Sequence, residues 1–192
     1  MSIVTKRFKE LAELIPEFEF HAQAAILNSG LAIASAFKSG NKLLICGNGG
    51  SAADSQHLAA EFINAFASDI TRVALPAIAL STDTSVITAI ANDFSFENIF
   101  ARQVEAYAKA GDILIVITTS GSSQNCLKAA NIANSRGVTT IALTRKGGAI
   151  SNLADISIEV PSSNTQHIQE CHMLSYHILT EIVENELFRK DN

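Results

Sequence analysis

The 192-residue sequence predicts an α/β fold, a three-layer α-β-α sandwich around a five-stranded, parallel, doubly wound sheet, with helices at its N-terminus. Five short runs are largely apolar, three of them throughout, and a helical pattern follows each of them. Hydrophobic residues make up 47% of the chain and charged residues 17%, so much apolar surface has to be covered. Strands that are apolar on both faces belong to a sheet covered by helices on both sides, and helical crossovers make that sheet parallel.

The first 40 residues are predicted to form two helices. Apolar residues recur at three- and four-residue steps between Phe8 and Ile15, and Pro16 is expected to end that helix. A second helix is expected over residues 18–38, before Gly40, because a glycine suits the left-handed position that follows a helix.

The remaining chain alternates strands and helices. The predicted strands are residues 43–46, 77–80, 113–117, 139–143 and 156–160. The predicted helices are residues 51–66, 84–91, 97–108, 123–135 and 165–188. In a doubly wound sheet the ligand lies beyond the carboxyl ends of the strands. Candidate binding loops are therefore residues 47–51, 81–83, 118–123 and 144–148.

Composition excludes several classes of function. The formal charge is −5 and no long run of like charges occurs, which argues against nucleic acid or an anionic membrane as a partner. The N-terminus lacks a signal-peptide core, and the strongest apolar run, residues 113–117, is too short to cross a bilayer. The three cysteines have neither disulfide-framework nor zinc-finger spacing. We therefore expect a cytoplasmic protein with buried, reduced thiols.

A glycine loop, residues 47–51 with the sequence GNGGS, joins the first strand to a helix. Glycines let the backbone turn tightly and bring its N–H groups close to a ligand, and the helix start favours an anion. Two other interpretations remain open. Gly47, Gly49 and Ala52 satisfy the loose dinucleotide pattern, and a tight turn that binds nothing would look the same.

A hydroxyl loop, residues 118–123 with the sequence TTSGSS, follows the third strand and places five hydroxyls around Gly121. Helix capping accounts for about one of them. Hydroxyls together with helix N-terminal amides satisfy the oxygens of a phosphate. Since the glycine loop and the hydroxyl loop follow neighbouring strands, they indicate one phosphorylated ligand across both. The basic turn at Arg145 and Lys146 is interpreted as solvated, although it could also face the ligand.

Two helices carry candidate acid–base and metal-binding groups. His57 and Glu61 are four residues apart after the glycine loop, so they share a helix face with Asp54. On the final helix Gln169 and His177 share a broad face.

His172 lies roughly 140° around the final helix from His177 and is expected to point elsewhere. Because the surrounding residues are apolar, His177 is either a satisfied core group or a functional one. Together His57, Glu61, Gln169 and His177 could bind a divalent metal such as zinc, or transfer protons at a carbonyl.

These motifs carry a family resemblance. The runs CGNGGSAADSQHLAAEF, LPAIALSTD, AIANDFSFENIFARQVEA, TTSGSSQNCLKA and HIQECHMLSYH resemble the phosphoheptose isomerases, which are SIS-domain proteins, in order and spacing. The resemblance covers residues 20–188. It implies a single SIS domain over residues 1–192, in which residues 1–40 serve oligomer packing and residues 41–192 form the core with the C-terminal helix.

The resemblance also implies a reaction: sedoheptulose 7-phosphate and D-glycero-D-manno-heptose 7-phosphate are interconverted through an enediol. This is the first step of nucleotide-activated heptose synthesis, which supplies lipopolysaccharide precursors. By resemblance, one zinc per subunit is held by His57, Glu61, Gln169 and His177, with Glu61 as base and His177 as acid. The implied substrate contacts are Asn48, Gly49, Gly50, Glu61, Asn92, Asp93, Thr118, Thr119, Ser120, Ser123 and Gln169. Family members form homotetramers with active sites at subunit boundaries.

The chain departs from the family pattern at three places. Ala65 stands where a substrate-facing arginine is usual, His167 replaces another arginine, and residues 67–75 form a slightly longer segment. An alternative function is a non-catalytic SIS-domain binding protein, such as a factor that associates with a replication initiator. That relative lacks the glutamate and the final histidine, whereas this chain keeps both Glu61 and His177.

Overall fold

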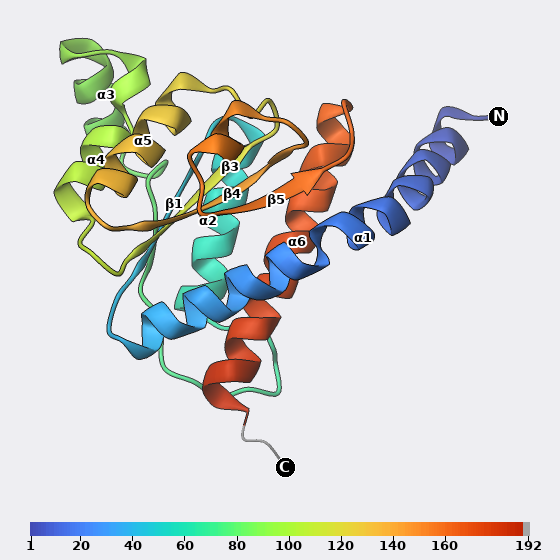
Figure 1. The fold of residues 1–192 in the computed structure, drawn as a ribbon, viewed down its shortest axis with the longest axis horizontal. Helices are drawn as coiled ribbons and strands as arrows, with labels where there is room; N and C mark the ends of the chain where they lie inside the picture. Colours follow the sequence, from blue (N-terminus) through green and yellow to red (C-terminus); the bar gives the residue numbers. More distant parts are fainter. Residues whose placement is uncertain (190–192) are drawn as a thin grey trace.

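The computed structural model describes residues 1–189, so the last three residues of the predicted 1–192 domain lie outside the described part. Its single sheet contains the strands β1 Leu43–Gly47, β2 Ala77–Ala79, β3 Ile113–Thr118, β4 Thr139–Arg145 and β5 Ile156–Val160. All neighbouring strands are parallel, in the order β2-β1-β3-β4-β5 (Figure 1). The prediction of a five-stranded parallel sheet is confirmed.

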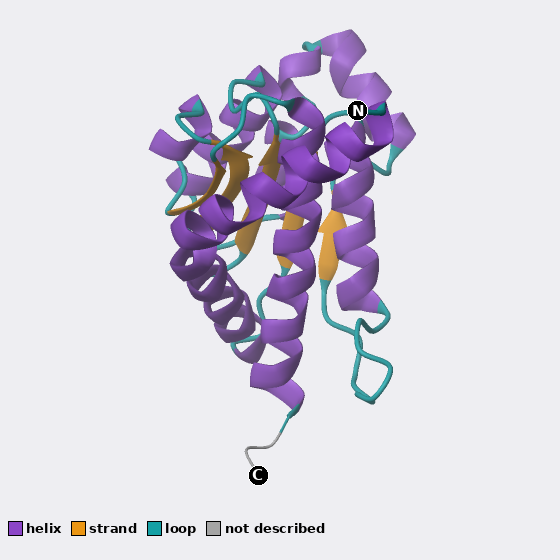
Figure 2. Ribbon diagram, turned by 90° about the vertical axis from the view of Figure 1, so that its right-hand side faces the viewer, coloured by secondary structure: helices purple, strands orange, loops and turns teal. Residues whose placement is uncertain are grey.

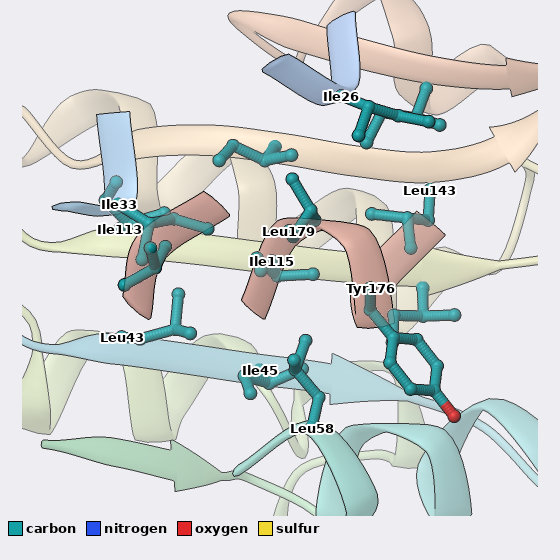
Figure 3. Packing of buried hydrophobic residues seen from close by; sticks show 14 of the residues in the cluster. Ile26, Ile33, Leu43, Ile45, Leu58, Ile113, Ile115, Leu143, Tyr176 and Leu179 are labelled. Carbon is teal, nitrogen blue, oxygen red and sulfur yellow. The ribbon is translucent and has the colours of Figure 1, made fainter. Parts of the chain in front are cut away.

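Helices cover both faces of this sheet (Figures 1 and 2). One face packs against α1 Ile3–Lys38, α2 Gly50–Ile63 and α6 Thr165–Phe188. The other face packs against α3 Thr84–Asp93, α4 Ala101–Tyr107 and α5 Gln124–Ser135, with the short 3₁₀ turns η1 Phe96–Asn98 and η2 Ala149–Asn152. Alternate strand residues enter the two cores, Ile45 and Ile115 on the first face (Figure 3) and Leu44 and Leu114 on the second. The predicted three-layer sandwich is confirmed.

The predicted break at Pro16 is wrong, because α1 runs through it as one helix of 36 residues. A proline inside a helix removes one backbone hydrogen bond and costs about 3 kcal/mol. Packing offsets this cost, since Phe18 is buried in the first core and Leu14 and Ile15 pack against the same cluster. Tertiary contacts with α6 therefore decide the continuity of the helix.

Two other helices differ from their predicted bounds. The helix expected over residues 97–108 is divided into η1 and α4, and the chain turns between them at Ile99 and Phe100, which are both buried. The helix expected over residues 51–66 ends at Ile63, where the following loop folds back toward α6. Within residues 1–189, no helix combines the length and the apolar character that a bilayer crossing requires.

The topology places the two predicted binding loops side by side. β1 and β3 are neighbours at the centre of the sheet, in a register that pairs Gly47 with Ile117. The glycine loop and the hydroxyl loop therefore leave the same edge of the sheet from adjacent strands. Because parallel strands all point the same way, this edge is the one at which doubly wound folds bind ligands.

Candidate functional site

Three hydroxyls of the hydroxyl loop converge on one another. Thr118 Oγ1 lies 3.3 Å from both Ser120 Oγ and Ser123 Oγ, and the two serine oxygens are 3.4 Å apart. Ser123 is the N-cap residue of α5, but its side chain makes no capping hydrogen bond. The hydroxyls are thus held at a helix N-terminus without being used to cap it, which is an arrangement suited to an anion.

The shape of the hydroxyl loop depends on Gly121. Its φ is +68°, and a Cβ added there would lie 2.4 Å from the Cα of Gly148. The turn after β4 therefore packs directly against the hydroxyl loop. Arg145 and Lys146 in that turn are exposed, in agreement with the interpretation of a solvated turn.

The glycine loop is joined to the hydroxyl loop by an amide pair. Asn48 Nδ2 donates to Asn125 Oδ1 at 2.9 Å, and Asn125 Nδ2 donates back to Asn48 Oδ1 at 2.8 Å. Asn125 is the second residue of α5, directly behind the hydroxyl loop. Sequence reasoning missed it, because an asparagine in a first helical turn gives no signal that distinguishes pairing from solvation. This contact makes the two loops one continuous surface.

The acid–base candidates of α2 and α6 meet in space. His57 Nε2 lies 2.9 Å from Glu61 Oε1, and the His57 ring centroid is 5.2 Å from that of His177. The ring of Phe66 also packs against His177, with 5.6 Å between the ring centroids. His57 is partly exposed and Glu61 less so, with 41% and 21% of the side chain accessible. A carboxylate and two imidazoles are thus adjacent to one another and reachable from solvent.

A buried hydrogen-bond chain supports this group. The hydroxyl of Tyr176 lies 3.0 Å from His57 Nδ1 and donates to Asp54 Oδ1 at 3.5 Å. Asp54 Oδ2 also accepts from Gln169 Nε2 at 2.8 Å. Figure 3 shows the Tyr176 ring among the apolar residues, with its oxygen on the side of α2 that carries Leu58. We call the six residues Asp54, His57, Glu61, Gln169, Tyr176 and His177 the helix-pair network.

Burial tunes the charges of this network. It raises the pKa of Asp54 although hydrogen bonds from Gln169 and Tyr176 oppose the shift. It also raises the pKa of Tyr176, with the neighbouring Asp54 adding to the effect, so Tyr176 stays protonated. Burial and the adjacent His57 lower the pKa of His177. A neutral imidazole at position 177 can both accept and donate a proton.

Gln169 connects the network to the start of α2. It contacts Asp54, and a Cβ added to Gly50 would lie 2.5 Å from its Nε2 and 2.8 Å from its Oε1. The glutamine therefore packs on the first residue of α2, in the glycine loop. This contact connects the network to the glycine loop (residues 47–51), which we call, together with the hydroxyl loop (residues 118–123), the anion loops.

Two of the predicted substrate contacts lie apart from this group in the sequence and the fold. Asn92 and Asp93 end α3, are exposed, and bond to each other, with Asn92 Nδ2 donating to Asp93 Oδ1 at 2.7 Å. Their part in binding stays a prediction. His172 is fully buried on α6, whereas His177 is partly exposed beside His57. Tyr176 was not predicted, because a tyrosine beside apolar residues gives no sign of its hydroxyl's partners.

The donor set fits a metal in its chemistry. Among residues 1–189 no three His, Cys, Asp or Glu side chains form a ready metal cage. The contact that orients His57 is nevertheless of the right kind, since Tyr176 holds His57 Nδ1 and leaves Nε2 facing Glu61. When the Tyr176 hydroxyl donates to Asp54, its oxygen accepts the hydrogen on His57 Nδ1, so His57 Nε2 carries a lone pair. His57 Nε2 and Glu61 Oε1 are then two acceptors 2.9 Å apart, which need a cation or a proton between them. Metal-binding histidines are typically oriented in this way.

Comparisons with known proteins agree on one family. A family model described as SIS domain matches residues 8–145. The phosphoheptose isomerase of Aquifex aeolicus (strain VF5) is 51% identical over 183 residues, which is 94% of each chain. That of Clostridium acetobutylicum is 54% identical over 157 residues, 81% of this chain and 79% of the relative. A solved phosphoheptose isomerase from Francisella tularensis superposes with a TM-score of 0.90 at 39% identity, covering 95% of this chain and 96% of the other.

Proposed function

Because this chain belongs to the phosphoheptose isomerase family of SIS-domain proteins, we propose that it interconverts sedoheptulose 7-phosphate and D-glycero-D-manno-heptose 7-phosphate, the first step of nucleotide-activated heptose synthesis. The observation that carries the proposal is the meeting of Glu61 with His57 and His177 in a network that also reaches the glycine loop. An aldose–ketose isomerisation needs such a pair of proton-transfer groups beside an anion site.

The anion loops bind the substrate. The hydroxyls of Thr118, Ser120 and Ser123 donate hydrogen bonds to the phosphate oxygens, since they converge at the N-terminus of α5. Asn48, Gly49 and Gly50 contact the sugar from the adjoining loop, with Gln169 against Gly50. Thr119, Asn92 and Asp93 complete the proposed contacts.

Proton transfer falls to the helix-pair network. Glu61 removes the proton from C1 or C2 of the sugar, giving an enediol, and returns it to the neighbouring carbon. His177, kept neutral by burial and by His57, exchanges protons with the sugar oxygens. Tyr176 and Asp54 hold the His57 ring in place through the 3.0 Å and 3.5 Å contacts.

The same residues form the proposed zinc site. His57, Glu61, Gln169 and His177 would hold one zinc ion per subunit, with His57 oriented by Tyr176. Bound there, the ion would polarise the oxygens at C1 and C2 as a Lewis acid. Gln169 would contribute its amide oxygen, because its Nε2 is already committed to Asp54.

Assembly into a homotetramer is part of the proposal. A largely apolar groove lies between α1 and α6, lined by Ile15, Phe18, Ile26, Leu27, Leu174, Ile178 and Ile182. The N-terminal turns of α1 project beyond the sheet layer in Figure 1 and expose Ile3, Val4 and Phe8. Other copies of the chain would cover this apolar surface. Light scattering of the purified protein measures the oligomeric state.

The test combines a turnover assay with a metal analysis. The purified protein is incubated with sedoheptulose 7-phosphate, its products are separated by chromatography, and its zinc content is measured by mass spectrometry. We expect turnover, about one zinc per chain and loss of both after chelation. Sedoheptulose without phosphate should react far more slowly.

Two variants connect turnover with the site. Glu61→Gln should lower kcat by about 10² to 10⁴, the range for a lost general base. Glu181→Gln, on an exposed position of α6, is the matched control and should leave kcat unchanged. A zinc-loaded oligomer without turnover, or a fully active Glu61→Gln variant, would contradict the proposal. Turnover would be absent if the chain were instead a non-catalytic binding protein.

A further inference from the structure

A fully buried ion pair lies beneath the candidate acid–base groups. Neither Arg72 nor Glu184 exposes any of its side chain, and Arg72 Nε donates to Glu184 Oε1 at 2.6 Å. Removing two charges from water is costly, so such a pair persists only when its remaining polar atoms are also satisfied. Here both side chains make further hydrogen bonds, and all of them are to the backbone around the site.

Arg72 binds the C-terminal turn of α2. Its Nη2 donates to the Glu61 carbonyl at 2.6 Å, and its Nη1 donates to the Phe62 carbonyl at 2.7 Å and the Val73 carbonyl at 3.0 Å. The last carbonyls of a helix have no partner within it and carry partial negative charge. No basic residue occurs in the last turn of α2 itself. Arg72, in the loop after α2, therefore provides the positive charge that this helix end lacks, and it fixes the last turn of α2, which carries Glu61.

Glu184 binds the loop from the other side. Its two oxygens accept from the amides of Phe66 and Ala67, each at 3.0 Å. Burial alone would raise the pKa of Glu184, but the hydrogen bonds from Phe66, Arg72 and Ala67 outweigh burial and lower it. The carboxylate is thus ionised. Figure 1 shows the loop after α2 running beside the C-terminal half of α6, where these contacts are made.

Both halves of the pair end at the proposed reaction site. Glu184 stands seven residues after His177, so the two lie on the same side of α6, about two turns apart. The Phe66 amide that Glu184 fixes belongs to the residue whose ring packs on His177 at 5.6 Å. Through Arg72 the same carboxylate is connected to the backbone of Glu61.

Arg72 does not replace the arginine that the family pattern expects at position 65. Its guanidinium is enclosed and its donors are directed at Glu184 and backbone carbonyls, so it cannot contact a substrate. The longer segment of residues 67–75 instead leads the chain back under α2. The arginine of this segment, Arg72, therefore binds groups of the protein and not the ligand.

We propose that Arg72 and Glu184 are positioning residues that hold Glu61 at a fixed distance from His177 for proton transfer. The inference deepens the proposed isomerase function and rests on it. Neither residue touches the substrate. Loss of the pair should therefore slow the chemical step while leaving the phosphate-binding loops, and hence KM, largely unchanged. A misplacement of 1 Å in a reacting group can cost about 100-fold in rate.

The test compares variants of the pair with a matched surface pair. Arg72→Met keeps most of the side-chain volume, Glu184→Gln keeps its shape, and Arg72→Lys keeps the charge without the guanidinium fork. The control is Arg189→Met, because Arg189 pairs with Asp69 at 3.1 Å and also joins this loop to the end of α6, but both side chains are exposed. Each variant is assayed with sedoheptulose 7-phosphate well below its own Tm, after circular dichroism shows that it is folded.

We expect kcat to fall about 10- to 100-fold in Arg72→Met and Glu184→Gln, with KM within about twofold of wild type. Arg72→Lys should recover part of the loss, and Arg189→Met should match the wild type. Folded variants with unchanged kcat would overturn the inference, as would an equal change in kcat and KM. If no variant of the pair folds, the role is structural and the inference is wrong. If the wild type itself has no turnover, the proposed function fails first.

Discussion

The anion loops and the helix-pair network meet at one edge of the sheet but are built in different ways. The loops are continuous in sequence, and their hydroxyls converge because one tight turn follows each strand. Apart from the His57–Glu61 contact within α2, the hydrogen bonds of the network join residues 115 to 122 positions apart, and these exist only because α2 packs on α6. Local sequence therefore encodes the proposed binding half of the site, whereas helix packing encodes the proposed reactive half.

Burial differs between the two regions as well. Ser120 is exposed and the groups around it are backbone amides and hydroxyls, whereas Asp54 and Tyr176 are almost completely buried. Substitutions of the loop hydroxyls should thus act on affinity, and substitutions in the network should act on rate or stability. The following experiments test that division, beginning with the largest expected effect.

Removing two loop hydroxyls should impair binding most. The double variant Ser120→Ala/Ser123→Ala loses two hydrogen bonds to a charged phosphate, each worth about 1.5–3 kcal/mol. KM for sedoheptulose 7-phosphate should rise at least about 100-fold, with a smaller change in kcat. Ser122→Ala is the control, because Ser122 is exposed and its hydroxyl lies outside the three-oxygen cluster. Steady-state kinetics measure both constants. An unchanged KM would show that the phosphate does not bind to the hydroxyl loop.

The turn that shapes the hydroxyl loop should be sensitive to one methyl group. Gly121→Ala places a Cβ 2.4 Å from Gly148 Cα at a φ of +68°, so strain and overpacking should cost about 2–5 kcal/mol of unfolding free energy. Gly147→Ala has a similar φ of +72° but nothing within 4 Å of its Cβ, and should cost about 1–2 kcal/mol. Urea unfolding measures both. Equal losses would mean that close packing against Gly148 is unimportant.

His172 should make the protein acid-sensitive independently of the site. Both of its ring nitrogens are buried, and burial lowers its pKa from 6.5 to about 4 although a contact with the Thr144 backbone opposes the shift. Because the unfolded chain takes up the proton first, the stability is fully present above pH 6.5 and is lost as the pH falls toward 4. At pH 5 the loss should be about 2 kcal/mol.

The variant His172→Phe should abolish that loss, which urea unfolding at pH 7.5 and pH 5 would reveal. His21→Phe, at an exposed position of α1, should leave the difference between the two pH values as in the wild type. If the wild type is equally stable at both pH values, His172 does not have the buried environment that we describe.

The hydroxyl of Tyr176 should have the smallest effect. Tyr176→Phe keeps the ring in the core but releases His57 Nδ1 and one oxygen of Asp54. We expect kcat to fall about tenfold, equivalent to about 1.4 kcal/mol, with weaker zinc retention during dialysis. The control Tyr107→Phe alters an exposed residue at the end of α4. A Tyr176→Phe variant with wild-type kcat and zinc retention would show that the Tyr176 hydroxyl does not orient His57.

Much of the fold was predictable because it follows from short-range patterns. The runs at residues 43–46 and 113–117 are apolar on both faces and became the central strands β1 and β3, and the run at residues 156–160, with Ser157 and Glu159 on one face, became the edge strand β5. Pro16 was misjudged, because a local rule predicted a break that packing of Phe18 against the first core overrides. The end of α2 was likewise misjudged, since it depends on Arg72 and Glu184, which are far apart in the chain.

The sequence by itself determined the doubly wound sheet, the two anion loops and the identity of the four candidate ligands, because periodicity, glycine spacing and motif order are properties of neighbouring residues. Only the tertiary structure decided that His57 and Glu61 lie beside His177, that Tyr176 and Asn125 belong to the site, and that Arg72 is directed into the protein. These contacts join segments separated by tens of residues. Their distances depend on how helices pack on a common sheet, which no local pattern records.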